Sequence, residues 1–210
     1  MNPVRGRAAR AAVLGALVFG ALFHAASGEA RAELSRVFRV SEGIRASMRE
    51  NKEKVPSEWV SRAEADLSWH RWWKVMPFME ARLDYDNSRW SRLEAGGELG
   101  WQPFSWVYLG NAIQRAWINP GRDRMEWEVR TLFTVPLPWW EIRSKKVALY
   151  ALNEWTYDID SGEGRRNEIG FGVRIPLPVP HLSSSLGWRH VDLIHGPDLD
   201  QFEGTLTAEF

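Results

Sequence analysis

The last ten residues, Gln201-Phe202-Glu203-Gly204-Thr205-Leu206-Thr207-Ala208-Glu209-Phe210, alternate between apolar or small side chains and polar ones. Successive side chains of a β-strand point to opposite faces, so this segment has one apolar side and one polar side. Its length of ~10 residues is that of a tilted strand crossing a bilayer. The segment is therefore predicted to be a membrane-spanning strand.

The N-terminal segment predicts export of the chain. Arg5, Arg7 and Arg10 precede an apolar or small run over 11–23, and Ala30-Arg31-Ala32 provides a small-x-small cleavage site. This order is that of a secretory signal peptide, and the apolar run is shorter than the ~20 residues of a spanning helix. We expect residues 1–32 to be removed, leaving 33–210 as one domain.

Composition narrows the class of the exported chain. Without residues 1–32 it keeps 23 basic and 26 acidic side chains, a net charge of −3, so nothing favours nucleic-acid binding. The absence of Cys excludes disulfides and a lipid-anchored lipoprotein. No metal-ligand spacing and no phosphate-binding glycine loop occurs, so neither a metal nor a cofactor is expected. Thirteen Trp together with short alternating segments favour a transmembrane β-barrel.

The strand count follows from the period-two segments. Nine are found after Glu58, but bacterial single-chain barrels have even numbers of strands. We therefore predict a tenth strand at 37–48, which places Glu42 on the lipid-facing side, and an all-β, up-and-down antiparallel barrel of about ten strands. The alternative is an N-terminal helix followed by eight strands, because apolar residues between Leu34 and Met48 also fit helical spacing. The nine segments are 59–69, 77–86, 91–101, 105–117, 124–135, 146–157, 167–175, 182–190 and 201–210.

The polar faces of these strands predict a charged lumen. Arg forms bidentate pairs with carboxylates, and a small barrel has an interior just filled by side chains. In 105–117, where the phase is ambiguous, we place Trp106, Tyr108, Gly110 and Ala112 outward. The predicted lumen network comprises Glu80, Arg82, Asp84, Arg92, Glu94, Glu98, Arg115, Glu126, Glu128, Arg130, Glu154, Glu168, Arg174 and Arg189.

The tryptophans are expected at the two rims, with none in the middle of a strand, because amphipathic rings prefer the level of the lipid headgroups. Short or Pro-rich links are predicted at the periplasmic end and longer polar ones outside. The periplasmic links are 70–76, 102–104, 136–145 and 176–180, and the external ones are 87–90, 118–123, 158–166 and 191–200. The predicted girdles comprise Trp59, Trp117, Trp127, Trp155 and Trp188 at the outer rim and Trp69, Trp101 and Trp106 at the inner rim.

Several short motifs resemble a family of Gram-negative outer-membrane barrels, domain-of-unknown-function family 2490. They are Glu80-Ala81-Arg82, Leu93-Glu94-Ala95-Gly96-Gly97, Arg130, Tyr150-Ala151-Leu152-Asn153-Glu154, Arg166-Asn167-Glu168-Ile169-Gly170 and Leu186-Gly187-Trp188-Arg189. The resemblance implies a barrel in the outer membrane, with outer-membrane lipid and lipopolysaccharide around it. The terminal Phe210 is similarly typical of such barrels, which implies recognition by the barrel-assembly machinery. The family implies no activity.

Three functions remain open at this level. The first is a structural, envelope-integrity barrel, or one that binds a ligand at its loops; the second is a narrow channel for small polar solutes. The third is a lipid-modifying enzyme, but Ser184 and His190 lie roughly 20 Å apart along one strand, and His181 and Ser183 lie at the periplasmic end. No catalytic residues are therefore assigned.

Overall fold

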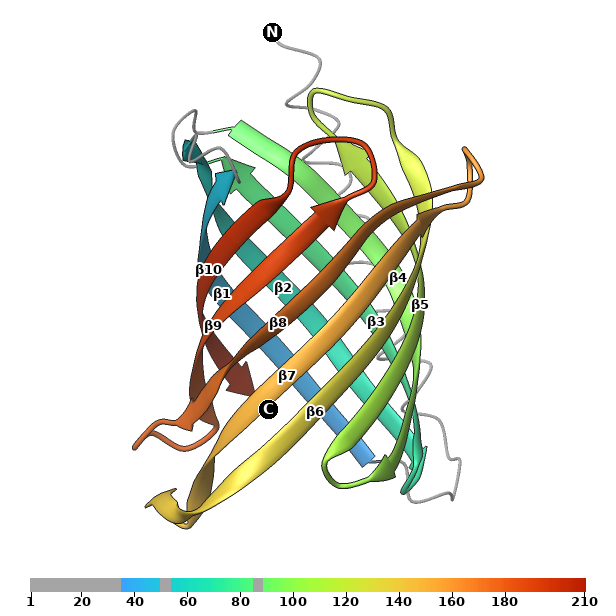
Figure 1. Ribbon diagram of the computed structural model, residues 1–210. Coiled ribbons are helices and arrows are strands. Elements are labelled where there is room, and N and C mark those ends of the chain that lie inside the picture. The colour runs from blue at the N-terminus through green and yellow to red at the C-terminus, as the bar shows by residue number, and fades with distance from the viewer. Residues whose placement is uncertain (1–34, 50–53, 85–88) are drawn as a thin grey trace, which may run out of the picture. The chain divides into compact units, whose positions relative to one another are not determined.

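The computed structural model describes residues 35–49, 54–84 and 89–210, which form ten antiparallel strands. Each strand pairs with its neighbours in the chain, and β1 pairs with β10 to close a barrel (Figure 1). The strands are β1 (Ser35–Arg49), β2 (Lys54–His70), β3 (Trp73–Asp84), β4 (Arg89–Phe104), β5 (Val107–Ile118), β6 (Arg124–Ile142), β7 (Lys145–Asp158), β8 (Glu163–Pro176), β9 (Leu182–Leu193) and β10 (Leu199–Glu209).

The predicted barrel of ten strands is confirmed, and its tenth strand lies where the parity argument placed it. β1 covers the predicted segment 37–48 and pairs with β10 on one side and β2 on the other. The alternative with an N-terminal helix and eight strands is wrong. Backbone groups facing lipid must be paired within the protein, and closure through β1 removes both sheet edges.

Strand pairing extends beyond the point where the alternation of side chains ends. β6 reaches Ile142 and joins β7 through the turn Arg143-Ser144, whose φ angles of 49° and 64° suit a tight hairpin. The predicted link 136–145 is therefore mostly strand. At the opposite end, β8 begins at Glu163, which shortens the predicted link 158–166. We call the end where β1 begins and β10 finishes the inner end, and the opposite end the outer end.

The two faces of the barrel wall differ sharply in chemistry. The outward face exposes large apolar side chains, while acidic side chains such as Glu98, Glu126 and Glu168 are at most 3% exposed on the inward face. An apolar exterior around a polar interior is the arrangement of a transmembrane barrel. The outward residues that are at least half exposed include Ile44, Ile113, Val135, Phe171, Leu186 and Phe202.

Glu42 faces outward, as predicted, and its carboxylate is hydrogen-bonded. The Trp59 indole N–H and the Ser61 hydroxyl each donate to Glu42 Oε2 at 2.6 Å. Two bonds to one oxygen lower the cost of placing a carboxylate on the apolar face, because buried polar groups are expensive only when unpaired.

Most of the described tryptophans cluster near the strand ends. Trp127, Trp155 and Tyr157 form one cluster toward the outer end, with ring centroids 5.7–6.4 Å apart. At the inner end, Trp73 stacks on Trp101 at 5.9 Å, while Phe104, Trp106 and Phe133 form a second stack.

Trp188 departs from the rim prediction. It lies near the middle of β9 and contacts Phe171 of β8 at 5.2 Å. The expectation that no Trp sits in mid-strand is therefore wrong here, because β9 continues to Leu193, beyond the predicted segment 182–190.

Three earlier predictions touch residues outside the described part of the structure. These are the signal peptide at 1–32, the side chain of Trp69 and part of the link 87–90. Among the residues that are described, no helix is long and apolar enough to cross a bilayer.

Candidate functional site: the charged lumen

The strand register places almost all of the predicted network inside the barrel. Arg115 is the exception: it pairs in register with outward-facing Ala95, and its guanidinium lies 3.7 Å from Asp160 at the outer rim. The predicted lumen residues that do face inward are Glu80, Arg82, Asp84, Arg92, Glu94, Glu98, Glu126, Glu128, Arg130, Glu154, Glu168, Arg174 and Arg189.

The predicted phase of β5 is wrong. Tyr108, Gly110 and Ala112 are buried inside, and Asn111 faces outward, where its amide oxygen accepts a 2.7 Å hydrogen bond from Trp127. The apolar alternation Val107, Leu109 and Ile113 indicates the correct phase. We missed it because two polar side chains, Asn111 and Arg115, interrupt the outward face.

Tyr108 projects from β5 into the lumen. Its hydroxyl donates a hydrogen bond to the carboxylate of Glu98. The ring lies against Gly100, where a Cβ would collide with it, so only glycine leaves room at that position. Lys74 lies over the same ring, 4.6 Å from its centroid.

Alternating charges form one chain of ion pairs along the wall from β1 to β4. It passes through β10, β9, β8, β7 and β6, and Arg130 at its far end binds three carboxylates. In order, the pairs are Arg45–Glu203 at 3.4 Å, Glu203–Arg189 at 3.0 Å, Arg189–Glu168 at 3.1 Å, Glu168–Arg166 at 3.0 Å, Arg166–Glu154 at 3.9 Å, Glu154–Arg130 at 3.0 Å, Arg130–Glu128 at 2.8 Å and Arg130–Glu98 at 3.4 Å.

A second chain covers the remaining wall, from β6 through β4, β3 and β2 to β1 and β10. It begins at Glu126 and Glu94, which Arg92 bridges. Its further pairs are Glu94–Arg82 at 3.5 Å, Arg82–Glu80 at 2.7 Å, Glu80–Arg62 at 3.3 Å, Arg62–Glu64 at 3.0 Å, Glu64–Arg39 at 3.2 Å and Arg39–Glu209 at 2.9 Å.

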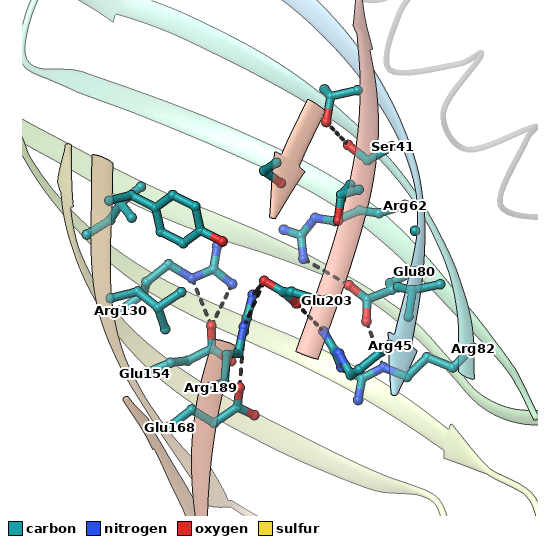
Figure 2. A pocket seen from close by; sticks show the side chains of 18 of the residues that line it. Ser41, Arg45, Arg62, Glu80, Arg82, Arg130, Glu154, Glu168, Arg189 and Glu203 are labelled. Atoms are coloured by element: carbon teal, nitrogen blue, oxygen red, sulfur yellow. Dashed lines mark hydrogen bonds and ion pairs between the residues drawn. The ribbon is translucent and has the colours of Figure 1, made fainter. Parts of the chain in front are cut away.

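The two chains together form what we call the ion-pair belt, which encircles the lumen. Both chains have members on β1 and β10 at one side and on β4 and β6 at the other. β5 joins through Gln114, whose amide donates to Glu94 at 3.4 Å and to Glu126 at 3.1 Å. Figure 2 shows Arg130 and Glu154 on one side of the interior and Arg62, Glu80 and Arg82 on the other.

Several members of the belt were not assigned to the network from the sequence. Arg39, Arg45 and Arg62 lie on the polar faces of the first two strands, so their alternation could have identified them. Arg166 fell in a predicted link, but in the structure it lies on β8. Lys74, which fell in another predicted link, lies on β3 beside the belt and binds Asp66 at 3.3 Å.

Cavities lie beside the belt at three levels of the described barrel. A middle cavity of about 260 Å³ is lined by charges of both signs in equal number, and an outer cavity of about 310 Å³ includes Asp84 and Arg166 in its wall. An inner cavity of about 430 Å³ includes Arg174, Tyr108 and the turn residues Ser105 and Trp106.

The histidines on and beside β9 do not complete a nucleophile–base pair with the nearby serines. His190 Nδ1 lies 3.2 Å from Asp200 Oδ1, near the outer end, whereas Ser183 and Ser184 begin the strand at its inner end. Across the described ranges, no three His, Asp or Glu side chains are grouped so that they could hold a metal ion.

Comparison with known proteins gives likenesses of shape alone. No family model matches the chain, and no curated protein matches it. The NanC porin is 9% identical over 83% of this chain and 99% of its own, with a TM-score of 0.44. The translocator domain of autotransporter NalP from Neisseria meningitidis is 8% identical over 97% of both chains, with a TM-score of 0.44. OccK11 (OpdR) from Pseudomonas aeruginosa is 12% identical over 88% of this chain and 68% of its own, with a TM-score of 0.34.

Proposed function

We propose that this protein is an outer-membrane barrel of a Gram-negative bacterium that acts as a non-conducting, structural element of the envelope. The inner end faces the periplasm and the outer end presents its loops outside. A closed wall satisfies every backbone group that faces lipid, and the large apolar side chains outside match a hydrocarbon environment.

The observation that carries the proposal is the ion-pair belt. Guanidinium groups of the belt project into the lumen from β1, β2, β3, β4, β6, β8 and β9, and each is held by carboxylates of its own strand or of nearby strands. A small barrel leaves little room beyond its own side chains. An ion entering this lumen would have to displace charge-assisted hydrogen bonds, which are roughly twice as strong as neutral ones.

The first prediction concerns conductance. The protein reconstituted into a planar bilayer is expected to show no steady single-channel current, because the paired side chains of the belt leave only small cavities in the lumen. Steady channel openings of the unaltered protein would contradict the closed lumen. They would favour a narrow channel for small polar solutes that runs through the outer, middle and inner cavities.

A variant tests whether the belt is what closes the lumen. Replacing Arg45, Arg189 and Glu203 together by serine removes three linked members of one chain. We expect this triple variant to conduct steadily. Arg115→Ser is the control, because it shortens an arginine on the outward face and should give no single-channel current. If the triple variant shows no current although its gel mobility is that of a folded barrel, the belt is not the barrier.

A further inference from the structure

Arg174 is an inward-facing arginine that does not belong to the ion-pair belt. It faces inward on β8, between Ala148 of β7 and Ser185 of β9, and its side chain is exposed to the inner cavity. Within the described chain, no carboxylate lies within ion-pairing distance of it. The belt arginines Arg130 and Arg189 are only 23% and 18% exposed and each binds two or more carboxylate oxygens.

Beside Arg174 the wall carries hydroxyl groups in place of carboxylates. The register places Ser185 and Thr205 on one cross-strand row with Arg174, and Ser183, Thr207 and Ser41 on the next row. Ser41 and Thr207 bond to each other at 3.1 Å. The hydroxyls of Ser183, Ser185 and Thr205 have no hydrogen-bond partner among the described residues, so they remain able to bind a ligand. Ser183 and Ser185 line the inner cavity, and Thr205 lines the adjoining middle cavity, whose wall also includes Arg174 and Ser185.

The charge of the inner cavity favours an anion. Its lining has four cationic side chains and two anionic ones, whereas the linings of the middle and outer cavities are balanced. Arg39 and Lys74 both pair with the buried carboxylate of Asp66, and Arg130 is held by the belt. The positive charge without a partner is therefore that of Arg174.

The cavity also has a shaped wall and an entrance. Tyr150, which lines the adjoining middle cavity, lies over Gly172 and Gly187, where an added Cβ would collide with its ring, so two glycines make room for this side chain. Gln102, Ser105 and Trp106 belong to the strand end and turn at the inner end and line the inner cavity. A solute could thus enter from that end without crossing the ion-pair belt.

We propose that the inner cavity, together with the adjoining part of the middle cavity beside Arg174, binds a small organic anion that carries hydroxyl groups, with its carboxylate or phosphate on the Arg174 guanidinium and its hydroxyls against Ser183, Ser185 and Thr205. Arginine presents a planar fork of donors that matches either anionic group, and the free hydroxyls can donate to or accept from the rest of the ligand. This site does not require the lumen to be closed, so it stands or falls separately from the structural role.

The test is isothermal titration calorimetry on the folded, full-length barrel domain in detergent. Gluconate and glycerol 3-phosphate are the carboxylate and phosphate probes, with sorbitol and glycerol as their neutral counterparts. Arg174→Gln is expected to weaken binding of the anions by about tenfold or more, because it removes a charge-assisted bidentate contact. Arg115→Gln removes the same charge on the outward face and should leave binding unchanged.

Two further arms keep the result decisive. Thr205→Val preserves shape but removes one hydroxyl, and it should weaken gluconate by about fivefold while leaving acetate unaffected. Binding of neither anion, equal binding of sorbitol and gluconate, or full affinity in Arg174→Gln would each overturn the site. If only one of the two anions binds, the result shows whether the site takes a carboxylate or a phosphate. If Arg174→Gln fails to fold by gel mobility, the Thr205→Val comparison alone decides: equal loss for acetate and gluconate, or no loss, overturns the proposal.

Discussion

Replacing Arg130 with alanine is expected to destabilise the folded barrel by about 3–5 kcal/mol, the usual effect of removing one partner from a buried ion pair. Its guanidinium lies 2.8 Å from Glu128, 3.0 Å from Glu154 and 3.4 Å from Glu98. Those three carboxylates are 1–6% exposed, so without Arg130 their charges would stand close together with little access to water. Urea titration of the reconstituted protein, followed by the mobility of folded and unfolded bands, measures the change.

The lumen contains its own control for this experiment. Arg174→Ala removes an inward arginine of the same size that has no carboxylate partner, and it should change the urea midpoint little. Combining Arg130→Met with Glu154→Gln removes both charges of one pair, so part of the lost stability should return. If Arg130→Ala and Arg174→Ala unfold alike, the belt does not stabilise the barrel.

Much of the fold could be predicted from alternation because the barrel wall separates lipid from a charged interior. Each strand therefore records its two environments directly in the sequence, as the terminal strand does most clearly. The requirement for an even number of strands then predicted β1. Its sequence alone is ambiguous, since Phe38, Ile44 and Met48 fit either a strand or a helix.

Alternation failed where a polar outward residue is satisfied by a partner distant in the sequence. Asn111 bonds to Trp127 of the next strand. The lipid-facing Glu42, whose side was predicted correctly, is satisfied in the same way by Trp59 and Ser61 of β2. Polarity alone assigned Asn111 to the lumen. Its hydrogen bond from Trp127 reduces the free-energy cost of placing its amide on the outward face. Small residues on the inward face of β5 added to the error, because Gly110 and Ala112 leave space for Glu98 and Glu128.

The pairing within the belt lay beyond the sequence for a different reason. Which arginine meets which carboxylate depends on the register between strands, and register depends on the turns and bulges at both ends. A shift occurs between Arg82 and Leu83 on β3, just where Arg82 reaches Glu80 and Glu94. The sequence could therefore predict a charged lumen but not a belt with Arg174 left outside it.

The closure between β1 and β10 allows a direct covalent test. Ser41→Cys combined with Thr207→Cys is expected to form a disulfide in nearly all folded molecules, because these residues are direct partners across the seam. Phe38 and Phe210 exchange both backbone hydrogen bonds, at 3.0 and 2.8 Å, so the odd-numbered partners of β1 are the more closely spaced, non-hydrogen-bonded pairs. The two hydroxyls already lie 3.1 Å apart, and the chain has no Cys to compete. Non-reducing gels after boiling measure the product, since the looped chain migrates faster.

The matched control moves one cysteine by two residues along β10, to the next position that faces the lumen. Ser41→Cys with Thr205→Cys uses residues of the same face that are not partners, since Thr205 pairs with Gly43. Diagonal neighbours in antiparallel strands are about 7–8 Å apart, farther than disulfide geometry accepts without backbone movement. The fast band should therefore appear for the first pair, disappear on reduction and be nearly absent for the second. Equal cross-linking of both pairs would mean that the β1–β10 register slides, and no cross-linking of either would mean that β1 does not close the barrel.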